Sequence, residues 1–340
     1  DKVLHVYNWS DYIGRTTIAD FEAQTGIKVS YDTYDSNEVL ETKLLTGRTG
    51  YDVVFPSGNF MQRQIRAGVF LKLDKSKLPN LSNMDPDIMR RVAANDPGND
   101  YAINYTWGTT GIGFNPAMVR NVLGTDRIDS WAAVFDPAIA SKLAKCGISM
   151  LDAPEDVIGS ARIFQGRDPN SESPADLSAS EELLTSVRPY VRYFHSFQQV
   201  NDLASGEICV ALSWNGHVLQ ARARGAAAAN PVEVAYVVPI EGAYLWFDMA
   251  AIPADAPHPE NAHAFLNFLM DPQVIANISN DIGYANGNAA SLPFVRDQLR
   301  NDPAVFPPDG IRAKLHPTVE FTPAYSRELN RAWTRIKTGQ

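Results

Sequence analysis

Aromatic residues stand beside carboxylate, hydroxyl or amide residues in five short stretches of the sequence, namely 8–12, 55–59, 213–217, 244–248 and 284–288. Flat aromatic walls combined with carboxylates suit an elongated cation. The rings pack against its methylene body, and the carboxylates accept charge-assisted hydrogen bonds from its ammonium group. For any one stretch, packing at a domain rim or helix capping is the simpler interpretation. Five such stretches together favour a binding site for a small amine.

Local motifs of common enzyme classes are missing from the sequence. There is no G-x-S-x-G, no H-E-x-x-H and no phosphate loop that ends in Gly-Lys-Ser/Thr. The six histidines are scattered, and His258 and His263, five residues apart among Pro and Asn, do not form a metal-binding pattern. We therefore expect no cofactor and no metal. Catalytic residues can be distant in sequence, so an enzyme remains a rival interpretation.

Composition limits the class of protein. The 340 residues include 30 Lys+Arg and 39 Asp+Glu, a formal net charge of −9, which argues against nucleic acid as a partner. With 45% apolar and 20% charged residues, the chain has an ordinary globular balance, and its length suggests two domains. No apolar run reaches the roughly 18 residues that cross a bilayer. The sequence shows no signal peptide, as is also true of a mature exported protein.

The N-terminal part alternates strand and helix patterns, which predicts an α/β fold with a mostly parallel sheet. The predicted strands are 3–7, 28–34 and 51–55, and the predicted helices are 16–25 and 36–45, with Ser36 as the candidate N-cap of the second helix. In open α/β sheets, ligands bind at the carboxyl ends of the strands. The stretches that follow the first and third strands should therefore share one edge of one sheet.

Two later segments, 105–114 and 234–239, have the pattern of crossings between two lobes. Each lobe would then consist of separated segments. We expect lobe 1 to comprise 1–106 plus 237–285, and lobe 2 to comprise 107–236 plus 286–340.

Cys146 and Cys209 are the two cysteines of the chain. In a cytosolic protein they would be unrelated thiols, and in an exported one they could form a single bridge. Composition does not choose between these states, and neither cysteine belongs to a C-x-x-C pair.

Many short motifs, in one order over nearly the whole chain, resemble the periplasmic polyamine-binding proteins, the putrescine/spermidine receptors of ABC importers. The resemblance is closest to the putrescine-binding branch. Its motifs include Y-N-W-S-D-Y at 7–12, Y-D-V-V at 51–54, T-T-G-I-G at 109–113, L-D-A-P-E at 151–155, D-P-N-S at 168–171, N-D-L-A-S-G at 201–206, Y-A-N at 284–286 and R-A-W-T at 331–334.

This resemblance implies a two-lobed solute-binding protein fold, with a mixed sheet flanked by helices in each lobe and the ligand in the interlobe cleft. It also implies a periplasmic monomer without enzymatic activity, whose partners are a small amine-containing ligand and the membrane permease of an ABC importer. Cys146 and Cys209 fall where the putrescine branch has a disulfide, which implies that they are bridged. The rivals are an enzyme that acts on a small amine in the cleft and a sensory receptor.

The resemblance also implies binding roles for individual residues. The matching positions for the first amine and the aromatic walls are Trp9, Ser10, Asp11, Tyr12, Ser57, Trp214, Trp246, Asp248 and Tyr284. Among them, Asp248 matches the carboxylate that pairs with the first ammonium. Trp246 stands where the putrescine branch has Phe.

The residues expected to bind the second end of the ligand differ from those of the putrescine-binding branch. His217 replaces an aspartate, and Asp156 replaces a glutamate. Removing one partner of a buried ion pair costs about 3–5 kcal/mol. We therefore expect an ω-amino acid, 4-aminobutyrate or 5-aminovalerate, to be preferred, with putrescine held by Asp156 as the alternative. Arg162 lies further along the helix expected to start near Pro154 and could reach the site, but an exposed surface position is the preferred interpretation.

Overall fold

The computed structural model describes residues 2–339 and divides into two compact units. The first unit comprises Asp1–Trp107 and Trp246–Asn301, and the second comprises Gly108–Leu245 and Asp302–Gln340. Each unit is therefore built from two segments that are far apart in the sequence. Among the described residues, none of the helices has the length and apolar character needed to cross a membrane.

The sheet of the first unit has the strand order β2-β1-β3-β9-β4. Its strands are β1 (Val3–Trp9), β2 (Lys28–Tyr34), β3 (Val53–Val54), the end of β9 (Ala243–Ala251) and the start of β4 (Ala102–Phe114). Strand β1 pairs in parallel with β2 and β3, whereas β9 is antiparallel to β3. The predicted parallel arrangement at the N-terminus is confirmed, although β3 is shorter than expected.

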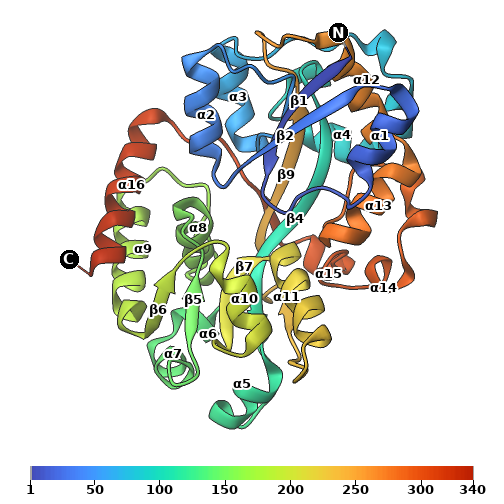
Figure 1. The fold of residues 1–340 in the computed structure, drawn as a ribbon. Coiled ribbons are helices and arrows are strands. Elements are labelled where there is room, and N and C mark those ends of the chain that lie inside the picture. Colours follow the sequence, from blue (N-terminus) through green and yellow to red (C-terminus); the bar gives the residue numbers. More distant parts are fainter. Residues whose placement is uncertain (1, 340) are drawn as a thin grey trace. The chain divides into compact units, whose positions relative to one another are not determined.

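Helices cover both faces of this sheet. They are α1 (Thr17–Thr25), α2 (Asn37–Thr46), α3 (Gly58–Arg66), α4 (Pro86–Val92), α12 (Pro259–Leu269), α13 (Pro272–Ile282) and α14 (Asp297–Arg300). In Figure 1, α2 and α3 lie on one side of β1 and β2, and α1 and α12 lie on the other. Ser36 caps α2 by accepting a hydrogen bond from the Val39 N–H at 3.2 Å, as its position in the sequence predicted.

The second unit has the strand order β4-β7-β5-β6, with β8 also paired to β4 and β10 paired to the start of β9. The strands are β5 (Ile148–Met150), β6 (Val191–Phe194), β7 (Val210–Trp214), β8 (Ala235–Val237) and β10 (Leu315–Pro317). Strands β5, β6 and β7 are parallel to one another, and β4 is antiparallel to β7. This sheet is therefore mixed.

Two groups of helices pack on the sheet of the second unit, with α8, α9 and α16 on one side in Figure 1 and α10 and α11 on the other. The helices are α5 (Pro116–Leu123), α6 (Ala132–Phe135), α7 (Pro137–Leu143), α8 (Pro154–Phe164), α9 (Pro174–Val187), α10 (Gln198–Ser205), α11 (Asn215–Ala227), α15 (Asp309–Arg312) and α16 (Pro323–Thr338). The C-terminal helix α16 contributes Trp333, Leu329 and Ile336 to the apolar core of this unit.

The passages between the units differ in part from the expected positions. Strand β4 carries the first passage, close to the predicted segment 105–114. The second passage lies in β9, while residues 234–239 form β8 and its flanks within the second unit. Residues 286–301 belong to the first unit, where Asn288 Nδ2 donates to the Met270 carbonyl at 2.8 Å.

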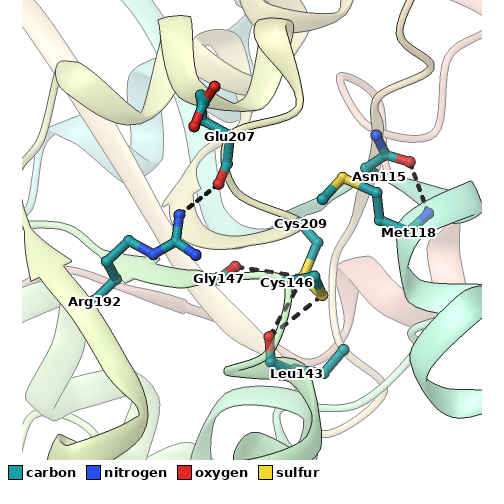
Figure 2. Close-up of a disulfide and its surroundings, with 8 residues drawn as sticks. All are labelled: Asn115, Met118, Leu143, Cys146, Gly147, Arg192, Glu207 and Cys209. Carbon is teal, nitrogen blue, oxygen red and sulfur yellow. Dashed lines mark hydrogen bonds between the residues drawn. A yellow bond between two sulfur atoms is a disulfide. The ribbon is translucent and has the colours of Figure 1, made fainter.

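A disulfide joins Cys146 and Cys209 in the second unit (Figure 2). Cys146 lies between α7 and β5, and Cys209 directly precedes β7. The N–H groups of Cys209 and Val210 both donate to the Gly147 carbonyl, at 3.0 and 3.2 Å, so the backbone already brings the two cysteines together. The bridge that the resemblance implied is present, and it links residues that are 63 positions apart.

We predict that reduction of this disulfide lowers the free energy of unfolding by about 4 kcal/mol, because a loop of this length gains chain entropy when it is opened. Urea unfolding with and without dithiothreitol measures the change. The Cys146→Ala/Cys209→Ala variant serves as control, since its midpoint should not respond to dithiothreitol. An unchanged midpoint for the reduced wild-type protein would contradict the prediction.

Candidate functional site

A buried carboxylate lies at the centre of a cluster in the first unit. The Asp248 cluster is defined as Tyr12, Ser57, Trp246, Asp248 and Tyr284. Asp248, on β9, is only 7% exposed. Its Oδ1 accepts a hydrogen bond from Ser57 Oγ at 2.6 Å, and its Oδ2 accepts one from Tyr12 Oη at 2.7 Å. Because Tyr12 follows β1 and Ser57 follows β3, the predicted meeting of these two strand ends at one edge is confirmed.

The phenol of Tyr12 keeps its proton at neutral pH. Burial raises the pKa of Tyr12 well above its ordinary value, and the negative charge of Asp248 raises it further. Since a carboxylate only accepts, the Tyr12 hydroxyl donates to Asp248, and the hydroxyl of Thr106 donates to the Tyr12 oxygen. Burial and then Asp248 also raise the pKa of Tyr34. The Asp248 carboxylate is thus held by two neutral hydroxyl donors, those of Tyr12 and Ser57.

Aromatic rings complete the Asp248 cluster. The Tyr284 ring makes edge-to-face contacts with Tyr12 and Trp246, at centroid distances of 5.4 and 5.2 Å. Trp246 is 9% exposed, and its indole N–H has no hydrogen-bond partner among the described residues. The cluster therefore combines a fixed carboxylate, packed rings and one buried donor that lacks an acceptor.

Two amides position the cluster, and neither was among the residues predicted from the sequence. Asn37 Nδ2 donates to Ser57 Oγ at 3.0 Å, and the Ser57 N–H donates to Asn37 Oδ1 at 3.1 Å. Asn104 Nδ2 donates to the backbone carbonyl of Asp248 at 3.1 Å. Asn37 stands between Asp35 and Glu38 shortly after Tyr34, and Asn104 precedes Tyr105, so an aromatic residue near each was the signal that could have found them.

The remaining expected residues of the first unit lie around the end of β1. Trp9 is half-buried, and its indole N–H donates to the Phe55 carbonyl at 2.9 Å. Ser10 Oγ donates to Asp35 at 2.7 Å. Asp11 is exposed in a turn, with a positive φ of 52°. The structure thus brings Tyr12 and Ser57 to the Asp248 carboxylate, while the Ser10 hydroxyl binds another acid.

A second carboxylate lies among aromatic residues in the second unit. The Asp156 cluster is defined as Thr110, Asp156, Trp214 and His217. Asp156 is in the first turn of α8, where the helix dipole favours a negative charge. Its Oδ1 accepts hydrogen bonds from Thr110 Oγ1 at 2.6 Å and from Trp214 Nε1 at 3.1 Å. Trp214 ends β7, and His217 follows in the first turn of α11. The two expected second-end residues thus flank one tryptophan.

His217 is held in one orientation. It is 8% exposed, its ring lies against Trp214 and Phe197 at centroid distances of 5.2 and 5.0 Å, and its Nδ1 is 3.1 Å from the Ser196 carbonyl. Because a carbonyl only accepts, Nδ1 carries a proton. In the neutral ring, Nε2 is then a hydrogen-bond acceptor.

The interpretation of Arg162 as a surface residue was wrong. It is 1% exposed, and Nη1 donates to the carbonyls of Ser171 at 2.6 Å and Pro169 at 3.3 Å. It also donates to the hydroxyls of Ser180 and Tyr325. Backbone carbonyls and hydroxyls satisfy the buried guanidinium. Arg162 therefore connects α8 with α9, with α16 and with the loop between α8 and α9.

Comparisons with known proteins agree with this arrangement. Residues 16–307 match the family described as bacterial extracellular solute-binding protein. The chain is 49% identical to the putrescine-binding periplasmic protein of Pseudomonas aeruginosa, in an alignment that covers 100% of this chain and 93% of that relative. It is also 49% identical to the putrescine-binding periplasmic protein of Escherichia coli, over 100% of this chain and 92% of that relative.

A solved structure extends the likeness to the fold. The substrate-binding protein of a spermidine/putrescine ABC transporter from Streptococcus pneumoniae matches with a TM-score of 0.83 and 26% identity, over 100% of this chain and 99% of that one. The expected two-lobed solute-binding protein fold, the periplasmic location and the role as a binding protein rather than an enzyme are confirmed by these relatives. The chain belongs to the bacterial extracellular solute-binding proteins and, within them, to the putrescine-binding branch of the periplasmic polyamine-binding proteins.

Proposed function

We propose that this chain, a periplasmic solute-binding receptor of an ABC importer, binds a small diamine of the putrescine class. The observation that carries the proposal is the Asp248 carboxylate, which is buried among aromatic rings and oriented by two hydroxyls. A buried charge is stabilised by a partner of opposite charge, and a primary ammonium fits both the carboxylate and the rings. The two relatives that are 49% identical to this chain are named for putrescine, which supports the same ligand class.

The Asp156 cluster supports an ammonium at the second end of the ligand. Asp156 supplies a carboxylate that Thr110 and Trp214 orient. With its Nδ1 proton directed to Ser196, His217 presents Nε2 as an acceptor whenever the ring is neutral. An acceptor suits an ammonium group, whereas a ligand carboxylate needs donors. The replacement of an aspartate by His217 therefore does not by itself exclude a diamine.

An ω-amino acid, which the sequence favoured because of His217, is the second candidate. The relatives give that preference no support, but one observation favours a ligand with an oxygen acceptor. The buried indole N–H of Trp246 has no partner among the described residues. An ammonium group offers only donors and leaves this N–H unsatisfied, whereas a ligand oxygen would accept from it.

Loss of the first-end charge should weaken the binding of every amine. Asp248→Asn keeps the shape of the side chain but removes the negative charge, so we expect the affinity for putrescine to fall by about 3–5 kcal/mol, a factor of hundreds or more. Isothermal titration calorimetry measures the change. Asp87→Asn, which removes an exposed carboxylate of the same unit, is the matched control and should bind as wild type. Binding by Asp248→Asn within threefold of wild type would refute the assignment.

Changing the second-end charge separates the two candidate ligands. We expect wild type to bind putrescine more tightly than 5-aminovalerate. Asp156→Asn should lose about 2 kcal/mol for putrescine, roughly 30-fold, and should not weaken 5-aminovalerate. Calorimetric titrations of both proteins with both ligands provide the comparison. Tighter binding of 5-aminovalerate by wild type would transfer the proposal to the second candidate.

Restoring an acid at position 217 should strengthen diamine binding. His217→Asp adds a carboxylate that attracts the second ammonium and repels a ligand carboxylate. The ratio of the affinities for putrescine and 5-aminovalerate should therefore rise at least about tenfold, equivalent to about 1.4 kcal/mol. His217→Asn, which adds no charge, is the control. An equal change in the affinity ratio for both variants would show that charge at this position is not the cause.

A further inference from the structure

Three side chains that could ligate a metal converge in the first unit: His5, Asp52 and His258. His5 lies within β1, Asp52 directly precedes β3, and His258 directly precedes α12. One ligand atom from each residue lies within 4.8 Å of the others. Of the residues that the structure describes, only these three His, Cys, Asp or Glu side chains form such a group. None of them belongs to the Asp248 cluster.

The backbone holds the Asp52 carboxylate in place. Asp52 is 0% exposed, and its Oδ1 accepts a hydrogen bond from the His258 N–H at 2.6 Å. Its Oδ2 accepts one from the His5 N–H at 2.8 Å. A carboxylate oxygen has two lone-pair positions, so each oxygen can accept a backbone hydrogen bond and still bind a second group. Asp52 is therefore an oriented ligand whose position does not depend on a metal.

The two imidazoles stand beside this carboxylate. His258 Nδ1 is 3.1 Å from Asp52 Oδ2, and the ring centroids of His5 and His258 are 5.8 Å apart. With metal–nitrogen and metal–oxygen bonds of about 2.0–2.2 Å, neighbouring ligand atoms around one ion lie roughly 3 Å apart. The His258–Asp52 pair already has this spacing, held by a hydrogen bond from Nδ1, so a bound metal ion would replace that proton, which is released to solvent. The His258 side chain is 21% exposed, which gives an ion access from solvent.

The histidine pair considered from the sequence, His258 and His263, was expected not to bind a metal. His263, five residues after His258, accepts a hydrogen bond from the Asp74 N–H at its Nε2 and donates from Nδ1 to the Pro259 carbonyl. Both nitrogens of His263 thus serve the packing of α12. The partners of His258 come from segments more than 200 residues away, so spacing in the sequence carried no signal for them.

We propose that His5, Asp52 and His258 bind one divalent transition-metal ion of the zinc class, with water completing its coordination. Two imidazoles and one carboxylate are a donor set typical of zinc, nickel and copper rather than of magnesium or calcium. The ion would cross-link the two segments of the first unit, because His5 and Asp52 lie in one and His258 in the other. An ion that binds only the folded state raises its stability by mass action.

The test uses tag-free protein treated with EDTA and then titrated with Zn²⁺ by calorimetry, with thermal unfolding measured in parallel. We expect one Zn²⁺ ion per chain and a higher unfolding midpoint, with no response to Mg²⁺. His258→Asn should weaken Zn²⁺ binding by at least about 100-fold, since loss of even a supporting residue costs 10–100-fold. The backbone N–H of residue 258 still reaches Asp52 in this variant, so the fold should be kept.

Two controls make the result decisive. His316→Asn removes a histidine of the second unit and should leave Zn²⁺ binding unchanged. Putrescine binding by His258→Asn should match that of wild type, which shows that the variant is folded and that the metal site is separate from the amine site. Zn²⁺ binding by His258→Asn within threefold of wild type, or no Zn²⁺-dependent rise of the wild-type midpoint, would overturn the proposal and leave a structural hydrogen bond between His258 and Asp52.

Discussion

The need to satisfy one buried charge organises the first unit. A carboxylate as buried as Asp248 would cost several kcal/mol without donors and a cation. Its two hydroxyl donors, Tyr12 and Ser57, follow β1 and β3, and the carboxylate itself lies on β9. Parallel pairing of β1 with β3 and antiparallel pairing of β3 with β9 bring the three together. The strand order β1-β3-β9 therefore places Tyr12 and Ser57 next to the Asp248 carboxylate.

Local patterns in the sequence were enough for the N-terminal elements and for the chemical type of the site. The strand at 28–34 has the predicted bounds, and Ser36 caps the next helix as expected. The stretches 8–12 and 55–59 were found because each follows a strand at one sheet edge, and the resemblance to the family singled out Tyr12 and Ser57 within them. The shortness of β3 could not be predicted, because the extent of strand pairing depends on backbone partners from distant segments, which a local pattern does not contain.

Side-chain partners between distant segments account for most of what the sequence did not reveal. Arg162 was expected to be exposed because arginine rarely is buried, yet the carbonyls of Pro169 and Ser171 give its guanidinium acceptors inside the unit. The proton position of His217 depends on the Ser196 carbonyl, which lies on a different segment. Residue type therefore predicted what each side chain could do, and tertiary structure decided which of those roles it has.

The division of each unit into two segments affects when the chain can fold. The first unit needs β9, so its sheet remains incomplete until residues 108–245 have also been synthesised. The second unit needs α16, which ends the described chain. Contacts between such distant segments form slowly, because a long loop must close before they contribute free energy. A chain synthesised from its N-terminus therefore stays unfolded until most of its residues have been made. An unfolded chain can pass through a narrow membrane channel on its way out of the cytoplasm.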